Sequence, residues 1–221
     1  MIPDVLVQYD TEIIQAIGET FIMVGASVVA AIVVGLPLGT LLYMTHPQKP
    51  MENKLLYQFC NTLVNIIRSF PFLLLVVFCI PLTRLIVGTA IGTTAAIVPL
   101  AIIAIAHYAR LVEQSLLDVP KGVVEAAQAM GASRWQIMTK FVFVDARSSL
   151  ILSLTTSIVS FISYSTIMGV VGGGGIGDFA IRYGYQQFKT DLMMYMILIM
   201  IILVQCIQLA GTFLARTLDK R

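Results

Sequence analysis

The sequence predicts an all-α protein that crosses a membrane several times. Hydrophobic residues make up 58% of the 221 residues and charged residues only 12%, whereas a soluble domain carries about 25% charged residues. The apolar residues fall in runs of about 20, the length that a helix needs to cross the hydrocarbon core of a bilayer. We therefore expect one transmembrane domain over residues 1–221, with five transmembrane helices.

Five apolar runs are long enough to be transmembrane helices. The predicted spans are residues 21–43, 55–81, 91–112, 150–171 and 192–214. The first follows an amphipathic segment that begins at Thr11. It contains Gly35 and Gly39, and small residues four positions apart allow close approach of another helix. We interpret this pair as a helix-packing surface.

The second predicted span is interrupted by Arg68-Ser69-Phe70-Pro71. Proline disfavours the helical conformation of the preceding residue, so the helix is expected to break near Phe70. A broken helix at membrane depth is tolerated where it lines a cavity or is buried in protein. Arg68 either lies beside a transport path or extends its charge to the membrane surface, and Arg68, Phe70 and Pro71 are candidate path residues.

The fourth predicted span carries hydroxyl groups along one face. They are spaced by three or four residues, which places them on the same side of a helix. The series is Ser149, Ser153, Ser157, Ser160 and Tyr164. Small polar residues commonly join transmembrane helices, but such a face can also line a wet path. Both interpretations stay open, and Ser157, Ser160 and Tyr164 are further candidates for the translocation path.

Lysine and arginine positions predict the orientation, because these residues concentrate in cytoplasmic segments. With the N-terminus outside and the C-terminus inside, ten of them face the cytoplasm and three face outward, while Arg68 is left uncounted within an apolar run. The ten are Lys49, Lys54, Arg110, Lys121, Arg134, Lys140, Arg147, Arg216, Lys220 and Arg221, and the three are Arg84, Arg182 and Lys189. The segment 118–145 is then cytoplasmic.

This segment, the longest polar stretch between the apolar runs, reads as two short helices. The first is predicted to start at Asp118-Val119-Pro120, since proline is tolerated in a first turn. Its apolar face holds Val123, Ala127 and Met130, and Gly131 can adopt the left-handed conformation that ends a helix. Ser133 and Gln136 form a predicted capping box for the second helix, whose apolar face is Trp135, Met138 and Val142.

Motifs for catalysis are missing from the sequence. The glycines of segment 172–177 are not followed by the lysine of a phosphate-binding loop, and this segment is predicted to be a flexible outer turn. No metal-ligand cluster, cofactor motif or nucleophile–base pair is present, so we expect neither an enzyme nor a resident cofactor or metal. Five spans are few to enclose a path, and a homodimer would supply ten. The predicted spans hold no carboxylate in their interiors, which favours energy from a partner over an ion gradient.

Glu125-Ala126-Ala127, followed three residues later by Gly131-Ala132, resembles the EAA loop of permease subunits in ATP-binding-cassette importers. The resemblance implies a type I importer fold, in which the loop docks into a cleft on a cytoplasmic ATPase subunit. Glu125, Ala126, Ala127, Gly131 and Ala132 would then couple the permease to ATP hydrolysis. The family pattern commonly ends in Leu-Pro, where this sequence has Phe143-Val144.

Further stretches, Arg68–Phe72, Thr83–Thr89 and Gly172–Tyr185, look like the methionine-uptake branch of these permeases. The resemblance implies a homodimer in a bacterial inner membrane, with two ATPase subunits and a periplasmic substrate-binding lipoprotein, importing D- or L-methionine. Two alternatives stay open from the sequence: an importer of this class for another small amino acid, and an ion-coupled secondary carrier.

Overall fold

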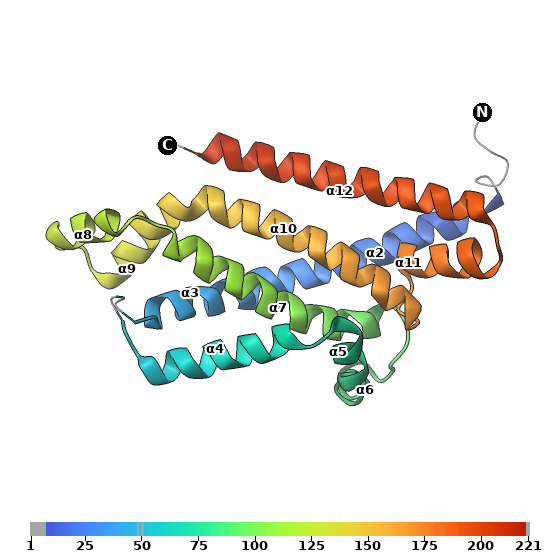
Figure 1. The fold of residues 1–221 in the computed structure, drawn as a ribbon, viewed down its shortest axis with the longest axis horizontal. Helices are drawn as coiled ribbons and strands as arrows, with labels where there is room; N and C mark the ends of the chain where they lie inside the picture. The colour runs from blue at the N-terminus through green and yellow to red at the C-terminus, as the bar shows by residue number, and fades with distance from the viewer. Residues whose placement is uncertain (1–7, 48, 50, 220–221) are drawn as a thin grey trace. The chain divides into compact units, whose positions relative to one another are not determined.

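The computed structural model of the chain describes residues 8–47, 49 and 51–219, and no β-strand occurs among them. The α-helices carry the labels of Figure 1, and three π-helical turns are labelled η. In chain order the elements are α2 (Asp10–Ala30), η1 (Ala31–Gly35), α3 (Leu36–Thr45), α4 (Lys54–Ser69), α5 (Phe72–Phe78), α6 (Ile80–Val87), α7 (Thr93–Leu117), α8 (Lys121–Ala129), α9 (Arg134–Gln136), η2 (Ile137–Val142), α10 (Phe143–Val170), α11 (Gly175–Phe179), η3 (Ala180–Gln186) and α12 (Thr190–Leu218).

Four continuous helical runs in the described chain are long and apolar enough to cross a membrane. They are Asp10–Thr45, Thr93–Leu117, Arg134–Val170 and Thr190–Leu218. A fifth crossing is formed if α4 and α5 count as one span, and these two helices are bent by 104° relative to each other. The all-α prediction with five spans agrees with this architecture when the bent pair is one of the five.

The second predicted span, 55–81, is not a single helix. α4 ends at Ser69, Pro71 lies outside any helix with ψ at 127°, and α5 begins at Phe72. Proline has no N–H to continue the helical hydrogen bonds and excludes the helical conformation of Phe70, so the predicted break falls where expected. The bent pair α4 and α5 ends at Phe78, and the last residue of the predicted range, Pro81, lies in the first turn of a separate helix, α6.

The chain forms two compact units, each built from three segments. The first unit comprises the described part of Met1–Val29 together with Phe70–Ala104 and Ile158–Ile207. Its buried cluster joins α2, α11 and α12 through Ile13, Ile176, Phe179, Leu192 and Met196. Van der Waals packing of such side chains stabilises helix contacts in a membrane.

The second unit comprises Ala30–Ser69, Ile105–Ser157 and the described part of Gln208–Arg221. Its glycines confirm the predicted packing surface, because an added Cβ at Gly35 would lie 2.9 Å from the carbonyl oxygen of Ile105, and one at Gly39 would lie 2.7 Å from Cβ of Val112. η1 and α3 therefore approach α7 closely through Gly35 and Gly39, respectively. In this unit α8 and α9 extend beyond the ends of α7 and α10 (Figure 1).

The glycine-rich segment after α10 is packed, and the prediction of a flexible turn was wrong. The amide of Gly175 donates to Oε2 of Glu19 at 2.7 Å, and the amide of Ile176 donates to Oγ1 of Thr20 at 2.9 Å. Gly174 and Gly175 have φ of 79° and 84°, a region that favours glycine. The glycines thus allow the backbone to turn tightly against α2 of the first unit.

Candidate functional site

The candidate site is formed by α8 and α9, the two short helices that connect α7 to α10 along the chain. Both belong to the second unit. α8 ends in a Schellman motif, in which the amide of Gly131 donates to the carbonyl of Gln128 at 2.9 Å and the amide of Ala132 donates to that of Ala127 at 3.1 Å. Gly131 has a φ of 74°, a conformation that costs a residue with a Cβ about 1–2 kcal/mol. The predicted glycine stop is confirmed.

The second short helix begins at the predicted capping box. The amide of Ser133 donates to Oε1 of Gln136 at 2.8 Å, and the amide of Gln136 donates to Oγ of Ser133 at 3.3 Å. The two side chains satisfy amides that a helix start leaves unpaired. Gly131 stops one helix and Ser133 caps the next, only two residues later. The exposed tip of the loop is therefore a short, defined turn.

α9 continues into α10 without a break. The helical run extends from Arg134 to Val170 and passes through the π turn η2 and then Val144. A proline at position 144 would remove a helical hydrogen bond, whereas valine retains its amide. The second short helix is therefore directly joined to the fourth long helix.

The five predicted coupling residues do not share one environment. Glu125, Ala126 and Gly131 are exposed and Ala132 is half-buried, whereas Ala127 is fully buried at 0% exposure. α8 packs on η2, so Ala127 belongs to the contact that holds α8 on the second short helix. The exposed residues form the surface that a partner can reach.

Two residues of the predicted apolar faces are exposed. Met130 is 68% and Trp135 72% exposed, while Met138 and Val142 are buried as expected. Helical periodicity alone had placed Met130 with Ala127 and Trp135 with Met138. Met130 and Trp135 instead flank Gly131 at the tip of the loop, where exposed apolar side chains are typical of a protein-binding surface.

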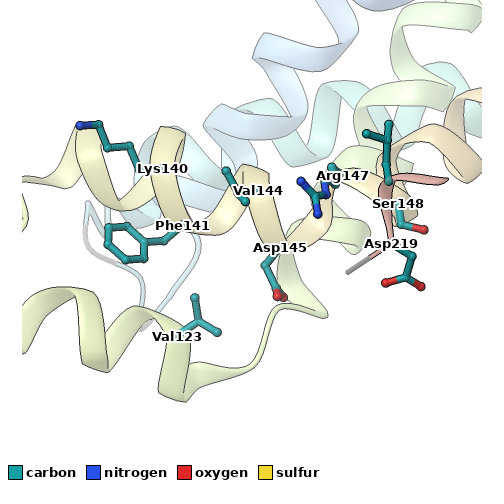
Figure 2. A pocket seen from close by; sticks show the side chains of 9 residues that line it. Val123, Lys140, Phe141, Val144, Asp145, Arg147, Ser148 and Asp219 are labelled. Carbon is teal, nitrogen blue, oxygen red and sulfur yellow. The ribbon is translucent and has the colours of Figure 1, made fainter. Parts of the chain in front are cut away.

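A first groove of about 260 Å³ lies beside the contact between α8 and η2, and residues of α8, η2, the start of α10 and the end of α12 line it. Figure 2 shows Val123 of α8 facing Phe141 across this space, with Asp145 nearby and Asp219 entering from the end of α12. The groove combines an apolar wall with charged residues of both signs. The end of α12 thus takes part in the surroundings of α8.

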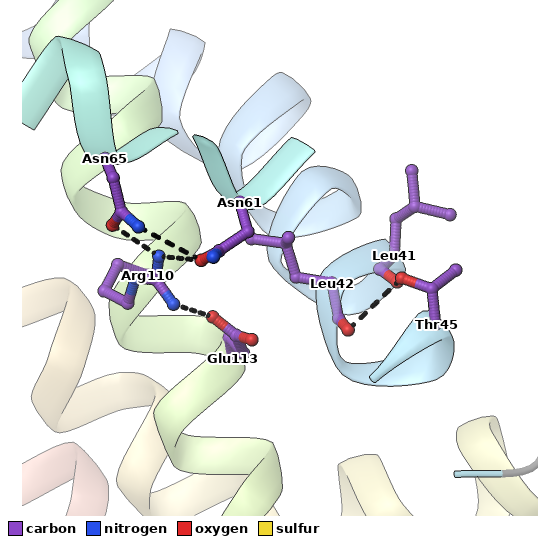
Figure 3. A network of polar contacts seen from close by, with 7 residues as sticks. All are labelled: Leu41, Leu42, Thr45, Asn61, Asn65, Arg110 and Glu113. Carbon is purple, nitrogen blue, oxygen red and sulfur yellow. Dashed lines mark hydrogen bonds and ion pairs between the residues drawn. The ribbon is translucent and has the colours of Figure 1, made fainter. Parts of the chain in front are cut away.

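A polar network joins α4 to α7 and was not predicted. Nη1 of Arg110 donates to Oε2 of Glu113 at 2.5 Å, and Nη2 donates to Oδ1 of Asn61 at 2.5 Å and of Asn65 at 2.7 Å (Figure 3). The two asparagines are four residues apart and therefore lie on the same face of α4, which is the signal that sequence reasoning could have used. The network ties the broken span to the helix that leads into α8.

The six candidate path residues are divided between the two units. Ser157 is fully buried and donates to the carbonyl of Ser153 at 2.8 Å. Oγ of Ser115 lies 2.8 Å from Oγ of Ser153 and accepts a hydrogen bond from Oγ of Ser149 at 3.1 Å. The lower part of the hydroxyl series is thus a helix-packing contact between α7 and α10.

The remaining path candidates lie near the break or on α10. Arg68 is exposed in the last turn of α4, and Phe70 and Pro71 are exposed in the break. In the first unit the ring of Tyr164 stacks on Phe72, with centroids 4.7 Å apart, and Ser160 is half-buried. Tyr164 and the residues after the break are therefore neighbours.

These features define a class of protein: a helical membrane subunit that presents a rigid, exposed helix pair for a partner. Residues 35–221 match the family model described as "Binding-protein-dependent transport system inner membrane component". This match covers most of the chain, and the chain belongs to that family.

Curated relatives within this family carry specific names. The chain is 46% identical over 209 residues to the probable D-methionine transport system permease protein MetI of Vibrio cholerae, covering 95% of this chain and 93% of that protein. It is 42% identical over 203 residues to the protein of the same name from Pasteurella multocida, covering 92% and 94%. It is 42% identical to D-methionine transport system permease protein MetI of Escherichia coli K12 over 157 residues, covering 71% and 72%.

Solved structures agree in fold. A chain in the inward-facing MetNI methionine ABC transporter is 39% identical and superposes with a TM-score of 0.93, covering 96% of this chain and 99% of that one. A chain of an amino acid ABC transporter with histidines has a TM-score of 0.79 at 18% identity. The latter supports the fold alone.

Proposed function

We propose that this chain is the permease subunit of an ATP-driven importer that carries methionine into the cytoplasm. The observation that carries the proposal is the similarity over 95% of the chain to permeases named for D-methionine transport. The exposed Glu125–Ala126 surface on α8 is consistent with it, because an ATP-driven permease needs a rigid element that transmits motion from the ATPase. Both stereoisomers of methionine are candidate substrates.

The assembly follows from the same similarity. The permease acts as a homodimer in a bacterial inner membrane, with two cytoplasmic ATPase subunits and a periplasmic substrate-binding lipoprotein. ATP hydrolysis belongs to the ATPase subunits, and the chain itself is not an enzyme. The lysine and arginine distribution supports an outside N-terminus and an inside C-terminus.

Within the loop we assign distinct roles. Glu125, Ala126, Gly131 and Ala132 form the docking surface, because they are exposed or half-buried at the tip. The fully buried Ala127 instead holds α8 on η2. As candidates for the translocation path we keep the residues that the sequence suggested, which are Arg68, Phe70, Pro71, Ser157, Ser160 and Tyr164.

Uptake measurements test the substrate. Proteoliposomes that contain the permease, its ATPase and its binding protein should accumulate labelled D- or L-methionine only with internal ATP. An excess of unlabelled methionine should abolish uptake, and a panel of other small amino acids should not. Competition by another amino acid would favour an importer with a different substrate, and uptake by the permease alone on a proton or sodium gradient would favour a secondary carrier.

Two substitutions test the coupling surface. Glu125→Lys reverses the exposed charge of α8, and Gly131→Trp places a large side chain at the left-handed turn. Both should leave the permease in the membrane and reduce ATP-dependent uptake by at least about tenfold, the first because like charges then meet at the interface and the second because the larger side chain obstructs docking. Lys54→Glu, an exposed charge reversal at the start of α4, is the control. Normal uptake by both loop variants would refute the assignment.

A further inference from the structure

A second groove lies on the other side of α8, next to the loop that follows α3. It has a volume of about 470 Å³. The residues on which the inference depends are His46, Lys49, Lys121, Val124, Glu125 and Gln128. All of them belong to the second unit. His46 and Lys49 come from the loop between α3 and α4, and this loop lies against α8.

Two positive charges in this groove lack a negative partner. Lys49 is half-buried, with Nζ 4.6 Å from the centroid of the Tyr43 ring, and Lys121 is exposed in the first turn of α8. Within the described part of the chain, no salt bridge joins either lysine to a carboxylate. The charge of Lys121 and burial both lower the pKa of Lys49, burial being the larger cause.

The groove is continuous with the proposed docking surface. Glu125 lines the groove and is also the exposed acid of the coupling helix. A protein surface that contacts Glu125 and Gln128 therefore also lies over Lys49 and Lys121. Complementary charge at that position would relieve the repulsion between the two lysines.

We propose that this groove is a second docking element for the ATPase subunit and receives an acidic side chain of that subunit. The inference depends on the proposed function, since it names a further contact with the same partner. The loop carrying Lys49 is tied to α4, because the ring of His46 packs on Tyr57 with centroids 5.1 Å apart. The ATPase thereby contacts the permease at α8 and at the loop that precedes the broken span.

Charge reversal tests the contact in the intact complex. The affinity of the purified ATPase for the detergent-solubilised permease is measured at low and high ionic strength for wild type and for the Lys49→Glu/Lys121→Glu variant. The variant should bind at least about tenfold more weakly at low ionic strength, because it opposes like charges. Its affinity should also depend less on salt than that of the wild type.

Lys54→Glu is the matched control. Lys54 is an exposed lysine at the start of α4 that does not line the groove, and its reversal should change the affinity less than twofold. If the double reversal fails to yield a monodisperse permease, Lys49→Gln and Lys121→Gln are measured instead. Each should weaken binding by about two- to fivefold, the usual range for one exposed charge pair.

Each outcome has a defined meaning. Wild-type affinity and salt dependence in the lysine variants, together with methionine import by the wild type, overturn this inference and leave the proposed function intact. Failure of the wild type to bind the ATPase or to import methionine overturns the proposed function itself. Unchanged ATPase affinity with import that falls only in vesicles containing phosphatidylglycerol assigns the groove to a lipid headgroup and overturns the inference.

Discussion

The guanidinium of Arg110 lies 2.5 Å from Oε2 of Glu113, three residues further along α7. Glu113 is buried at 1% exposure, and its other carboxylate oxygen, Oε1, is buried with no hydrogen-bond partner among the residues that the structure describes. The same guanidinium contacts Asn61 and Asn65 of α4 (Figure 3). Arg110 is therefore both the ion-pair partner of Glu113 and the donor of the polar contact between α7 and α4.

Arg110→Met should destabilise the permease strongly. The substitution removes the cation and leaves a buried carboxylate, and breaking a buried ion pair in this way costs about 3–5 kcal/mol. We expect a lower unfolding temperature of the purified permease in detergent. Arg110→Met/Glu113→Gln should recover at least half of the loss, because no buried charge is left. Equal stability of the single variant and the wild type would contradict this role.

Local chemistry made several features predictable. Pro71 breaks a helix through its own covalent structure, and the Ser133–Gln136 capping box acts over three residues. The left-handed turn at Gly131 is similarly local. Such features can be read from a sequence because the residues that cause them are neighbours in the chain.

Features that depend on distant contacts were missed. The glycine segment after α10 was expected to be flexible, because nothing near it in sequence indicates that Glu19 accepts a hydrogen bond from the amide of Gly175. Trp135 was placed on the same apolar face as Met138 and Val142, and it is exposed while they are buried, since periodicity identifies an apolar side of a helix but not what covers it. The Arg110 network depends on pairing across 49 residues.

Gly39→Ala should destabilise the close contact of α3 with α7. The added Cβ would lie 2.7 Å from Cβ of Val112, and forcing extra volume into a packed contact costs about 1–3 kcal/mol. Gly25→Ala is the control, because its Cβ would meet nothing within 4 Å and alanine favours a helix by up to about 1 kcal/mol. Thermal unfolding of both variants distinguishes them, and a Gly39→Ala variant as stable as Gly25→Ala would refute close packing.

Glu19→Ala should loosen the glycine segment of the first unit. It removes the acceptor for the Gly175 amide, a charged hydrogen bond of 2.7 Å, and such bonds contribute about 1.5–3 kcal/mol. Hydrogen–deuterium exchange of residues 172–177 should accelerate by about tenfold to a hundredfold. Glu12→Ala replaces an exposed glutamate of the same helix and should leave this exchange unchanged. Slow exchange in the Glu19 variant would show that the hydrogen bond does not hold the segment.

Lys121→Gln should raise the pKa of Lys49. Burial and the charge of Lys121 both hold this pKa below the usual 10.5, so between the lowered value and 10.5 the unfolded chain binds more protons than the folded chain. Stability contributed by this group therefore increases with pH across that window, and removal of Lys121 should reduce the increase. A titration of ¹³C-methylated lysines by NMR measures the shift, with Lys140→Gln as a control that leaves Lys49 unchanged. An unaltered titration of Lys49 in the Lys121 variant would mean that the two charges do not interact across the groove.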